Sequence, residues 1–215
     1  MQIKNIFTIL IIILLFSAQS YFQLSYAAEN RDACDRDCVN DYGTHLGTTR
    51  NGVVAYSNCN NDCVVFEAER YQGTYTGVKW QCVEFARRWL LINYGVIYGD
   101  VDYAIDIWDK IDHYSRVKDN KEIKLTALLN GSARAPVKGD LLIYAKALLG
   151  TGHVAVVVAA DNKTNTLFIA EQNYSNEKWL NNFSRKISYV KKDGRYWLLE
   201  PYLIGWKHAE IESLI

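Results

Sequence analysis

The cysteines of this chain are confined to its first 82 residues, and their spacing constrains the fold more than any other feature. The chain of 215 residues holds five cysteines, Cys34, Cys38, Cys59, Cys63 and Cys82, and the first four form two C-x-x-x-C pairs. In an oxidising compartment an even set forms disulfides, and the cysteine left over is a free, reactive thiol. If both pairs lie on helical turns, a helical hairpin would join Cys34 to Cys63 and Cys38 to Cys59, one of three possible connectivities. A four-cysteine zinc site is the alternative, although zinc ligands more often have two intervening residues.

The first 27 residues are typical of a secretory leader. The positive Lys4 precedes an apolar run over residues 6–16, and the small residues Ser25 and Ala27 suit a signal peptidase. The run is shorter than the roughly 20 apolar residues that a membrane-spanning helix needs. We therefore predict a signal peptide over residues 1–27 and a secreted or periplasmic protein, without stable membrane association after cleavage.

The remaining chain suits one domain with a sizeable core. Without Lys4 of the leader it has 23 basic and 24 acidic residues, and no basic patch dominates, so nucleic acid is not an expected partner. We divide the chain into a disulfide-linked N-terminal arm over residues 28–65 and a main domain over residues 66–210.

Periodicity predicts helices first and strands second in the main domain. Apolar residues at helical spacing predict a helix over residues 81–93 that ends at Gly95, and Asp100 is a candidate cap for a second helix. Runs rich in β-branched residues, and the Asp193-Gly194 turn, predict antiparallel strands. These strands cover residues 141–144, 152–160, 166–173, 186–190, 195–199 and 203–208. The expected architecture is α+β, with N-terminal helices packed on an antiparallel sheet.

Two residues suggest nucleophilic chemistry. Cys82 lies at the start of the first predicted helix, in KWQCVEFARRWL, where the helix dipole favours the thiolate form that attacks carbonyl carbon. His153 lies at the edge of an apolar strand, in GHVAVVV. A cysteine at a helix start facing a histidine on a strand is the arrangement of papain-like thiol hydrolases. Taken singly, each residue could equally be a structural core residue.

These two segments occur together with a turn at residues 136–140 and with AEQN at residues 170–173, in the order seen in the CHAP family. That family consists of cysteine, histidine-dependent amidohydrolases and peptidases. The resemblance covers residues 71–207 and is closest to the amidase domains of bifunctional glutathionylspermidine synthetase/amidases. It implies a papain-like fold, cleavage of a C–N amide bond through a cysteine thioester, and no metal or organic cofactor. The four-cysteine arm and the leader depart from that amidase, which is cytoplasmic.

The resemblance also implies a catalytic role for three residues. Cys82 matches the nucleophile, and His153 matches the general base that takes the thiol proton and later delivers it to the leaving amine. Glu171 matches the carboxylate that accepts the other ring N–H and fixes the tautomer. A surface carboxylate at a strand end is the alternative for Glu171.

Three further residues receive less specific roles. Asn173 shares a strand face with Glu171 and is an alternative orienting group. Gln81 could add its amide to an oxyanion hole formed with the Cys82 backbone N–H. Arg87 could bind a substrate carboxylate, although a solvated helix face accounts for it equally well.

The expected partner is a small substrate from one of two classes. The motifs favour a peptide–polyamine amide such as glutathionylspermidine, and export favours a cell-wall peptide amide. The alternative from another class is a non-catalytic secreted binding module or effector that retains the cleft. A redox protein is a third reading, but the cysteine spacing is not C-x-x-C.

Overall fold

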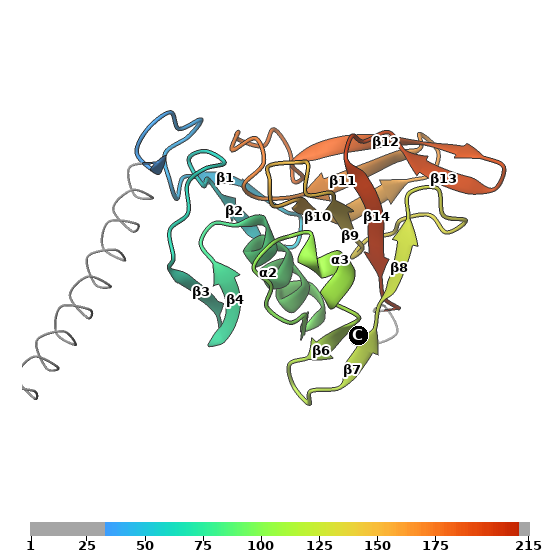
Figure 1. Cartoon of the computed structure of the whole chain (residues 1–215), viewed down its shortest axis with the longest axis horizontal. Coiled ribbons are helices and arrows are strands. Elements are labelled where there is room, and N and C mark those ends of the chain that lie inside the picture. The colour runs from blue at the N-terminus through green and yellow to red at the C-terminus, as the bar shows by residue number, and fades with distance from the viewer. Residues whose placement is uncertain (1–32, 211–215) are drawn as a thin grey trace, which may run out of the picture.

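The computed structural model describes residues 33–210, so the predicted signal peptide lies outside the described residues. Between residues 33 and 210 no helix is both long and apolar enough to cross a membrane. In chain order the elements are β1 (His45–Thr48), β2 (Val54–Tyr56), β3 (Ala68–Tyr71), β4 (Thr74–Val78), α2 (Cys82–Tyr94), β5 (Val96–Ile97), α3 (Asp106–Lys110), β6 (His113–Arg116), β7 (Glu122–Lys124), β8 (Thr126–Leu129), β9 (Leu141–Tyr144), β10 (His153–Asp161), β11 (Thr166–Ala170), β12 (Arg185–Lys192), β13 (Arg195–Leu198) and β14 (Leu203–His208). Figure 1 shows their arrangement.

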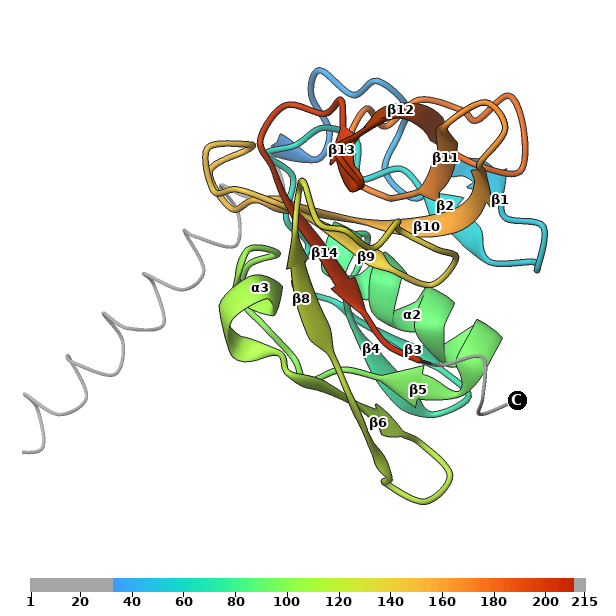
Figure 2. The same ribbon diagram turned by 90° about the vertical axis from the view of Figure 1, so that its right-hand side faces the viewer.

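A seven-stranded sheet forms the body of the molecule, in the order β13-β12-β11-β10-β9-β14-β8. Every neighbouring pair in it is antiparallel, and β8 and β14 run side by side in Figure 2. The sheet curls so that its two edges meet. The backbone of Tyr196 in β13 accepts a hydrogen bond from the N–H of Gly131 and donates one to the carbonyl of Ser132, just after β8. The side chain of Asn130 strengthens this junction by pairing with both backbone groups of Leu198.

Alternate residues of β10 enter two hydrophobic cores. Val154 and Val156 belong to the first core, which they share with the buried face of α2. Ala155 and Val157 belong to the second core, which includes Trp206 of β14. Because a fully buried large apolar side chain stabilises a fold by about 1.5–3 kcal/mol, both cores hold β10 firmly in place.

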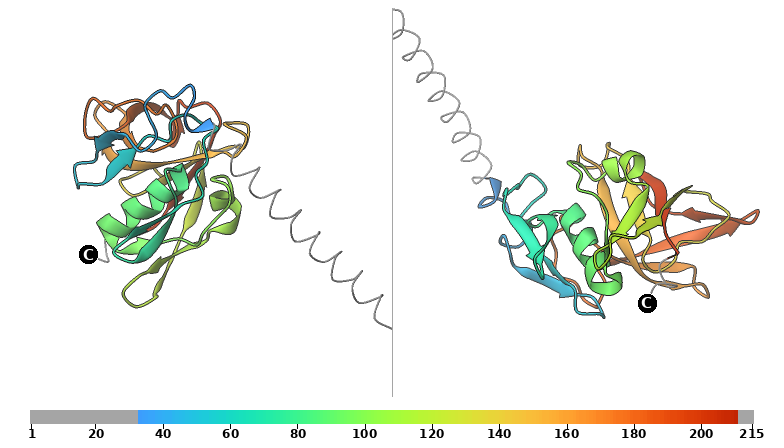
Figure 3. Two further views of the ribbon diagram at one scale, coloured as in Figure 1. Left: turned by 90° about the vertical axis from the view of Figure 1, so that its left-hand side faces the viewer. Right: turned by 90° about the horizontal axis from the view of Figure 1, so that it is seen from below.

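Helix α2 packs on two sides. Its residues 82–90 are buried, and Figure 3 (right) shows the helix between the β3–β4 hairpin and the large sheet. The helix ends at Gly95, whose φ of 65° is left-handed and whose N–H bonds to the Leu91 carbonyl. The predicted glycine stop is therefore confirmed. The burial of residues 82–90 fixes the start of α2 relative to β10.

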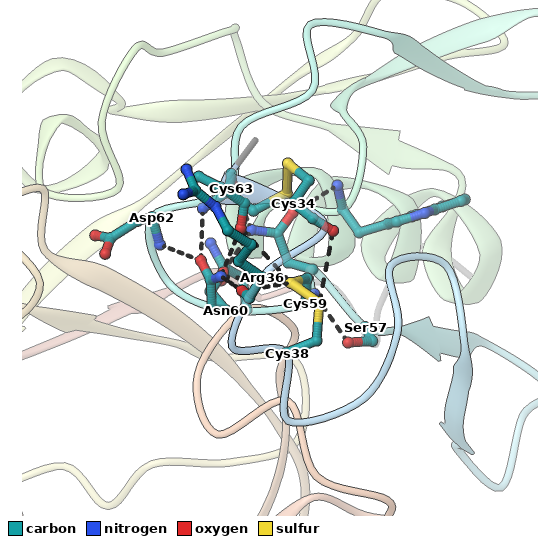
Figure 4. Close-up of a disulfide and its surroundings, with 12 residues drawn as sticks. Cys34, Arg36, Cys38, Ser57, Cys59, Asn60, Asp62 and Cys63 are labelled. Atoms are coloured by element: carbon teal, nitrogen blue, oxygen red, sulfur yellow. Dashed lines mark hydrogen bonds between the residues drawn. A yellow bond between two sulfur atoms is a disulfide. The ribbon is translucent and has the colours of Figure 1, made fainter. Parts of the chain in front are cut away.

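The N-terminal arm is cross-linked by the disulfides Cys34–Cys63 and Cys38–Cys59, the connectivity that the spacing suggested. None of the four cysteines lies in a helix, since Cys34 is in a turn and the other three are in irregular segments, and Figure 4 shows both bonds close together. Asn60 adds a polar link, since its side chain donates to two backbone carbonyls of the opposite segment at 2.6 and 2.9 Å.

Two expectations about the elements differ from the structure. The α+β class is confirmed, but the strands β1–β4 precede α2, so the order of helices first is wrong. These strands have three to five residues, too few to show a clear alternation. The second helix, α3, begins at Asp106 rather than near Asp100. Asp100 does not cap it, because its carboxylate pairs with Arg87 at 2.8 Å.

Candidate active site

Cys82 is the first residue of α2 and the free cysteine of the described chain. It is buried, with 8% of the residue exposed. The chain reaches it through Gln81 in an extended conformation. Close packing of β4 on the first helical turn depends on Gly77, where a Cβ would lie 3.0 Å from the Glu84 backbone. The sulfur is thus held where the hairpin, the helix and the sheet meet.

His153 is the first residue of β10, and its ring is completely buried. Gly152 precedes it with φ 74°, and a Cβ there would lie 2.6 Å from the carbonyl oxygen of Tyr144. Only glycine suits this position, which turns the chain into the strand. The His153 Nε2 atom lies 2.9 Å from Oε2 of Glu171. Nδ1 has no partner of ordinary hydrogen-bond geometry in the described chain, so it is the nitrogen available to Cys82.

The thiol and the imidazole stabilise each other's charged forms. Burial opposes the thiolate, but the charge and hydrogen bonding of His153, together with the backbone N–H groups of Val154 and Val83, lower the pKa of Cys82 below its ordinary value. Burial likewise opposes the imidazolium, but the Cys82 sulfur and Glu171 raise the pKa of His153 to about 9. Both pKa shifts favour the thiolate–imidazolium form of the pair, in which the sulfur is the nucleophile.

Glu171 follows the end of β11 and is 2% exposed. Burial favours its protonated form, but the hydrogen bond and charge of His153, and the charge of Arg185, hold the pKa of Glu171 below its ordinary value. The structure brings together Cys82, His153 and Glu171, three residues that are distant in sequence. The contacts of Arg185 were not anticipated from the sequence.

Gln81 and Asn173 lie against each other rather than against the imidazole. Asn173 donates from Nδ2 to Oε1 of Gln81 at 2.8 Å. The Gln81 amide nitrogen donates to Oδ1 of Asn58 at 3.2 Å and to the carbonyl of Cys63 at 3.3 Å. The amide group predicted for the oxyanion hole therefore points toward the disulfide-linked arm, and Glu171 rather than Asn173 contacts His153.

Arg87 is buried and bonded within the protein. Its Nε donates to the carbonyl of Tyr98 at 3.1 Å, and its Nη1 pairs with Asp100 at 2.8 Å. Its guanidinium also lies over the rings of Tyr75 and Tyr98. A substrate carboxylate would therefore reach Arg87 by replacing Asp100, whose side chain is 55% exposed.

A buried polar cluster behind the site was missed from the sequence. Glu84 is fully buried and pairs with Arg88, with Nε and Nη2 bonding its two oxygens at 2.7 and 3.1 Å. Gln172 reaches Glu84 and also bonds the backbone N–H of Tyr56. The four-residue spacing of Glu84 and Arg88 on a helix was the available signal. Across residues 33–210, no group of three or more His, Cys, Asp or Glu residues is arranged to hold a metal ion.

Comparison with known proteins agrees with this geometry. Residues 71–173, which contain all the predicted site residues, match the CHAP domain. The chain contains a CHAP domain. The predicted resemblance is thereby confirmed, and the CHAP domain together with the likeness to a glutathionylspermidine synthetase/amidase supports a cysteine amidase or hydrolase.

The similar curated proteins are named for the synthesis of glutathionylspermidine or trypanothione, and one of them also for an amidase activity. The bifunctional glutathionylspermidine synthetase/amidase of Escherichia coli is 36% identical over 187 residues, covering 77% of this chain and 29% of that protein. Trypanothione synthetase of Crithidia fasciculata is 31% identical over 160 residues, covering 74% of this chain and 24% of that protein. Glutathionylspermidine synthase of the same organism is 33% identical over 136 residues, covering 60% of this chain and 19% of that protein. The chain thus spans less than a third of each of these relatives.

Proposed function

We propose that the protein is an exported cysteine amidohydrolase with Cys82 as nucleophile, His153 as general base and acid, and Glu171 as the group that orients the imidazole. The observation that carries this proposal is the buried contact of His153 with Glu171 on one ring nitrogen and its electrostatic coupling to Cys82 on the other side. The position of a cysteine at a helix start beside a histidine on a strand supports a papain-like arrangement.

The proposed reaction has two steps. The Cys82 thiolate attacks the amide carbonyl carbon, a C–S bond forms, and the C–N bond breaks as the His153 imidazolium gives its proton to the leaving amine. A water molecule then gives a proton to neutral His153 and attacks the thioester carbonyl, the C–S bond breaks, and the carboxylic acid leaves with the thiolate and imidazolium restored. Glu171 stays ionised throughout and stabilises the imidazolium.

The developing oxyanion needs N–H donors near Cys82. The backbone N–H of Cys82, at the N-terminus of α2, has the position and dipole to supply one. The side-chain nitrogen of Gln81 is bonded to the arm. We therefore propose that Gln81 contributes to the oxyanion hole by positioning the backbone directly before the nucleophile. Asn173 would then hold the Gln81 amide from the opposite side.

The proposed substrate is an amide between a glutathionyl group and a polyamine, of the glutathionylspermidine type. The names of the similar proteins support this class. Arg87 would take a substrate carboxylate in place of Asp100, since guanidinium and carboxylate form a fork-like pair. The carboxylate of a γ-glutamyl group has the required chemistry.

A cell-wall peptide amide is the second candidate. The two disulfides favour it, because such bonds persist in oxidising compartments outside the cytosol. The proposed localisation is secreted or periplasmic, and no nucleic acid or organic cofactor takes part in the proposed reaction.

The test is to incubate the purified, oxidised protein separately with glutathionylspermidine and with peptidoglycan, and to identify released amines by mass spectrometry. Release of spermidine by the native protein, and not by a folded Cys82→Ala variant, supports the first substrate. Release of cell-wall peptides alone supports the second. Equal release by the Cys82→Ala variant would refute the mechanism, and binding of either compound without turnover would favour a binding module.

A further inference from the structure

The two oxygens of the Glu171 carboxylate have separate partners. Oε2 faces Nε2 of His153 at 2.9 Å. Oε1 accepts a hydrogen bond from Nε of Arg185 at 2.7 Å and another from the Ser184 hydroxyl at 3.1 Å. Nη2 of Arg185 approaches Oε2 at 3.5 Å, so the guanidinium lies alongside the carboxylate. The plane of the carboxylate is therefore set from the side opposite the imidazole.

Arg185 is itself held in place by groups from other segments of the chain. It begins β12, and its Nη1 pairs with Glu200, which lies between β13 and β14. Nη2 donates to the Tyr144 hydroxyl at 3.1 Å, at the end of β9. The ring of Tyr174 is close to both cationic groups, with 5.1 Å from its centroid to that of the His153 ring and 4.5 Å from its centroid to the Arg185 guanidinium carbon. A side chain with this many partners has one orientation.

A buried carboxylate is stable as an anion only when it is paired and hydrogen-bonded. Glu171 has two cationic partners, and only one of them, His153, changes its charge during the proposed reaction. When His153 has given its proton to the leaving amine, Arg185 is the remaining positive charge in contact with the buried carboxylate. It can thus keep Glu171 ionised at the stage when the imidazole is neutral.

We propose that Arg185 is a positioning residue, whose guanidinium fixes the Glu171 carboxylate so that it holds the His153 ring with Nδ1 toward Cys82. This inference rests on the proposed function of these three residues. Arg185 acts through Glu171 and has no direct role at the reacting sulfur.

The test compares the variants Arg185→Met, Arg185→Lys and Lys186→Met. Lys186→Met is the matched control, because Lys186 is the next residue of β12, is exposed, and lies over the rings of Phe168 and Phe183 rather than at the site. The first readout is the rate at which iodoacetamide alkylates Cys82 as a function of pH. It depends on the thiolate and needs no substrate. The second is kcat and KM for glutathionylspermidine.

In Arg185→Met, the acid limb of the alkylation profile should move to higher pH, because loss of the guanidinium raises the pKa of Glu171 and weakens its support of the imidazolium. The kcat value should fall by about 100-fold, the usual effect of a misplaced catalytic group, with KM little changed. Arg185→Lys should keep the acid limb near its native position but lower kcat, since it retains the charge without the planar fork. Lys186→Met should match the native protein in every readout.

A native alkylation profile in folded Arg185→Met would overturn the inference, as would native kcat in Arg185→Lys. If Arg185→Met does not fold, Arg185→Lys decides, because it leaves no unpaired buried carboxylate. Failure of the proposed function gives a different result: glutathionylspermidine is not cleaved by the native protein, while the alkylation profile still shifts in Arg185→Met.

Discussion

The side-chain oxygen of Asn58 accepts a hydrogen bond from the amide nitrogen of Gln81 at 3.2 Å. Asn58 is fully buried beside the disulfide-bonded Cys59, and Gln81 directly precedes the candidate nucleophile. The Asn58 amide nitrogen also donates to the Cys63 carbonyl at 2.6 Å. The disulfide-linked arm therefore contacts the residue before Cys82 through the Asn58 side chain, in addition to the Cys63 carbonyl.

Replacement of Asn58 should affect both stability and turnover. Asn58→Ala leaves the Gln81 amide and the Cys63 carbonyl with fewer partners, and should lower the free energy of unfolding by about 1–3 kcal/mol. It should also lower the rate of substrate hydrolysis, because the backbone before Cys82 loses a tether. Asn61→Ala, at an exposed position of the same loop, is the control and should change neither quantity. Denaturant unfolding and steady-state kinetics measure the two effects, and a native hydrolysis rate in Asn58→Ala would show that the tether is not needed for catalysis.

Loss of one disulfide should destabilise the protein without exposing a second reactive thiol. The Cys38→Ser/Cys59→Ser double variant opens a link between residues 21 apart in sequence, which corresponds to about 3 kcal/mol of unfolding free energy. The midpoint of urea unfolding should fall accordingly, and iodoacetamide should label Cys82 alone in the native oxidised protein. Labelling of two or more thiols in that protein would contradict the disulfide assignment.

The apolar spacing of the sequence predicted individual helices and strands of this fold. The strand at residues 203–208 and the helix with its Gly95 stop were found at or within one residue of their expected bounds, because their apolar spacing is regular. The partners of the site residues were not predictable in this way. Asn58 lies 23 residues from Gln81, and Arg185 lies 14 residues from Glu171, so only the folded chain shows that they meet. The closure of the sheet at Tyr196 likewise has no local signature.

The coupled pKa values of Cys82 and His153 predict the shape of the pH profile. The pKa of His153 is raised to about 9, so the imidazolium and the stability it contributes are fully present below its ordinary pKa and are lost as pH rises through about 9. The pKa of Cys82 is lowered, so the thiolate is lost only when the pH falls below the ordinary pKa of a cysteine thiol and through the lowered value. The kcat/KM value for hydrolysis should therefore have its alkaline limb near pH 9, because His153 must protonate the leaving amine.

The same coupling can be checked without substrate. Cys82→Ala removes the sulfur that favours the imidazolium, so the pKa of His153 should fall in that variant when followed by NMR. An alkaline limb near pH 6.5 in the kcat/KM profile would show that the pKa of His153 is not raised in the native protein. An unchanged His153 titration in Cys82→Ala would show that the sulfur does not raise it.

The buried pair of Glu84 and Arg88 should be among the most sensitive sites for stability. Glu84 is fully buried, and Arg88 is its charged partner within the described structure, so Arg88→Met leaves a carboxylate in the core without its counter-charge. Removing one partner of such a pair typically costs about 3–5 kcal/mol. Lys110→Met removes an exposed lysine from the pair with Asp106 at the same helical spacing and should change the unfolding free energy by less than about 0.5 kcal/mol. Because Gln172, the residue directly after Glu171, contacts both members of this pair, we also expect Arg88→Met to slow hydrolysis. Urea unfolding of both variants provides the comparison, and equal midpoints would mean that the charge of Glu84 is stabilised by other groups.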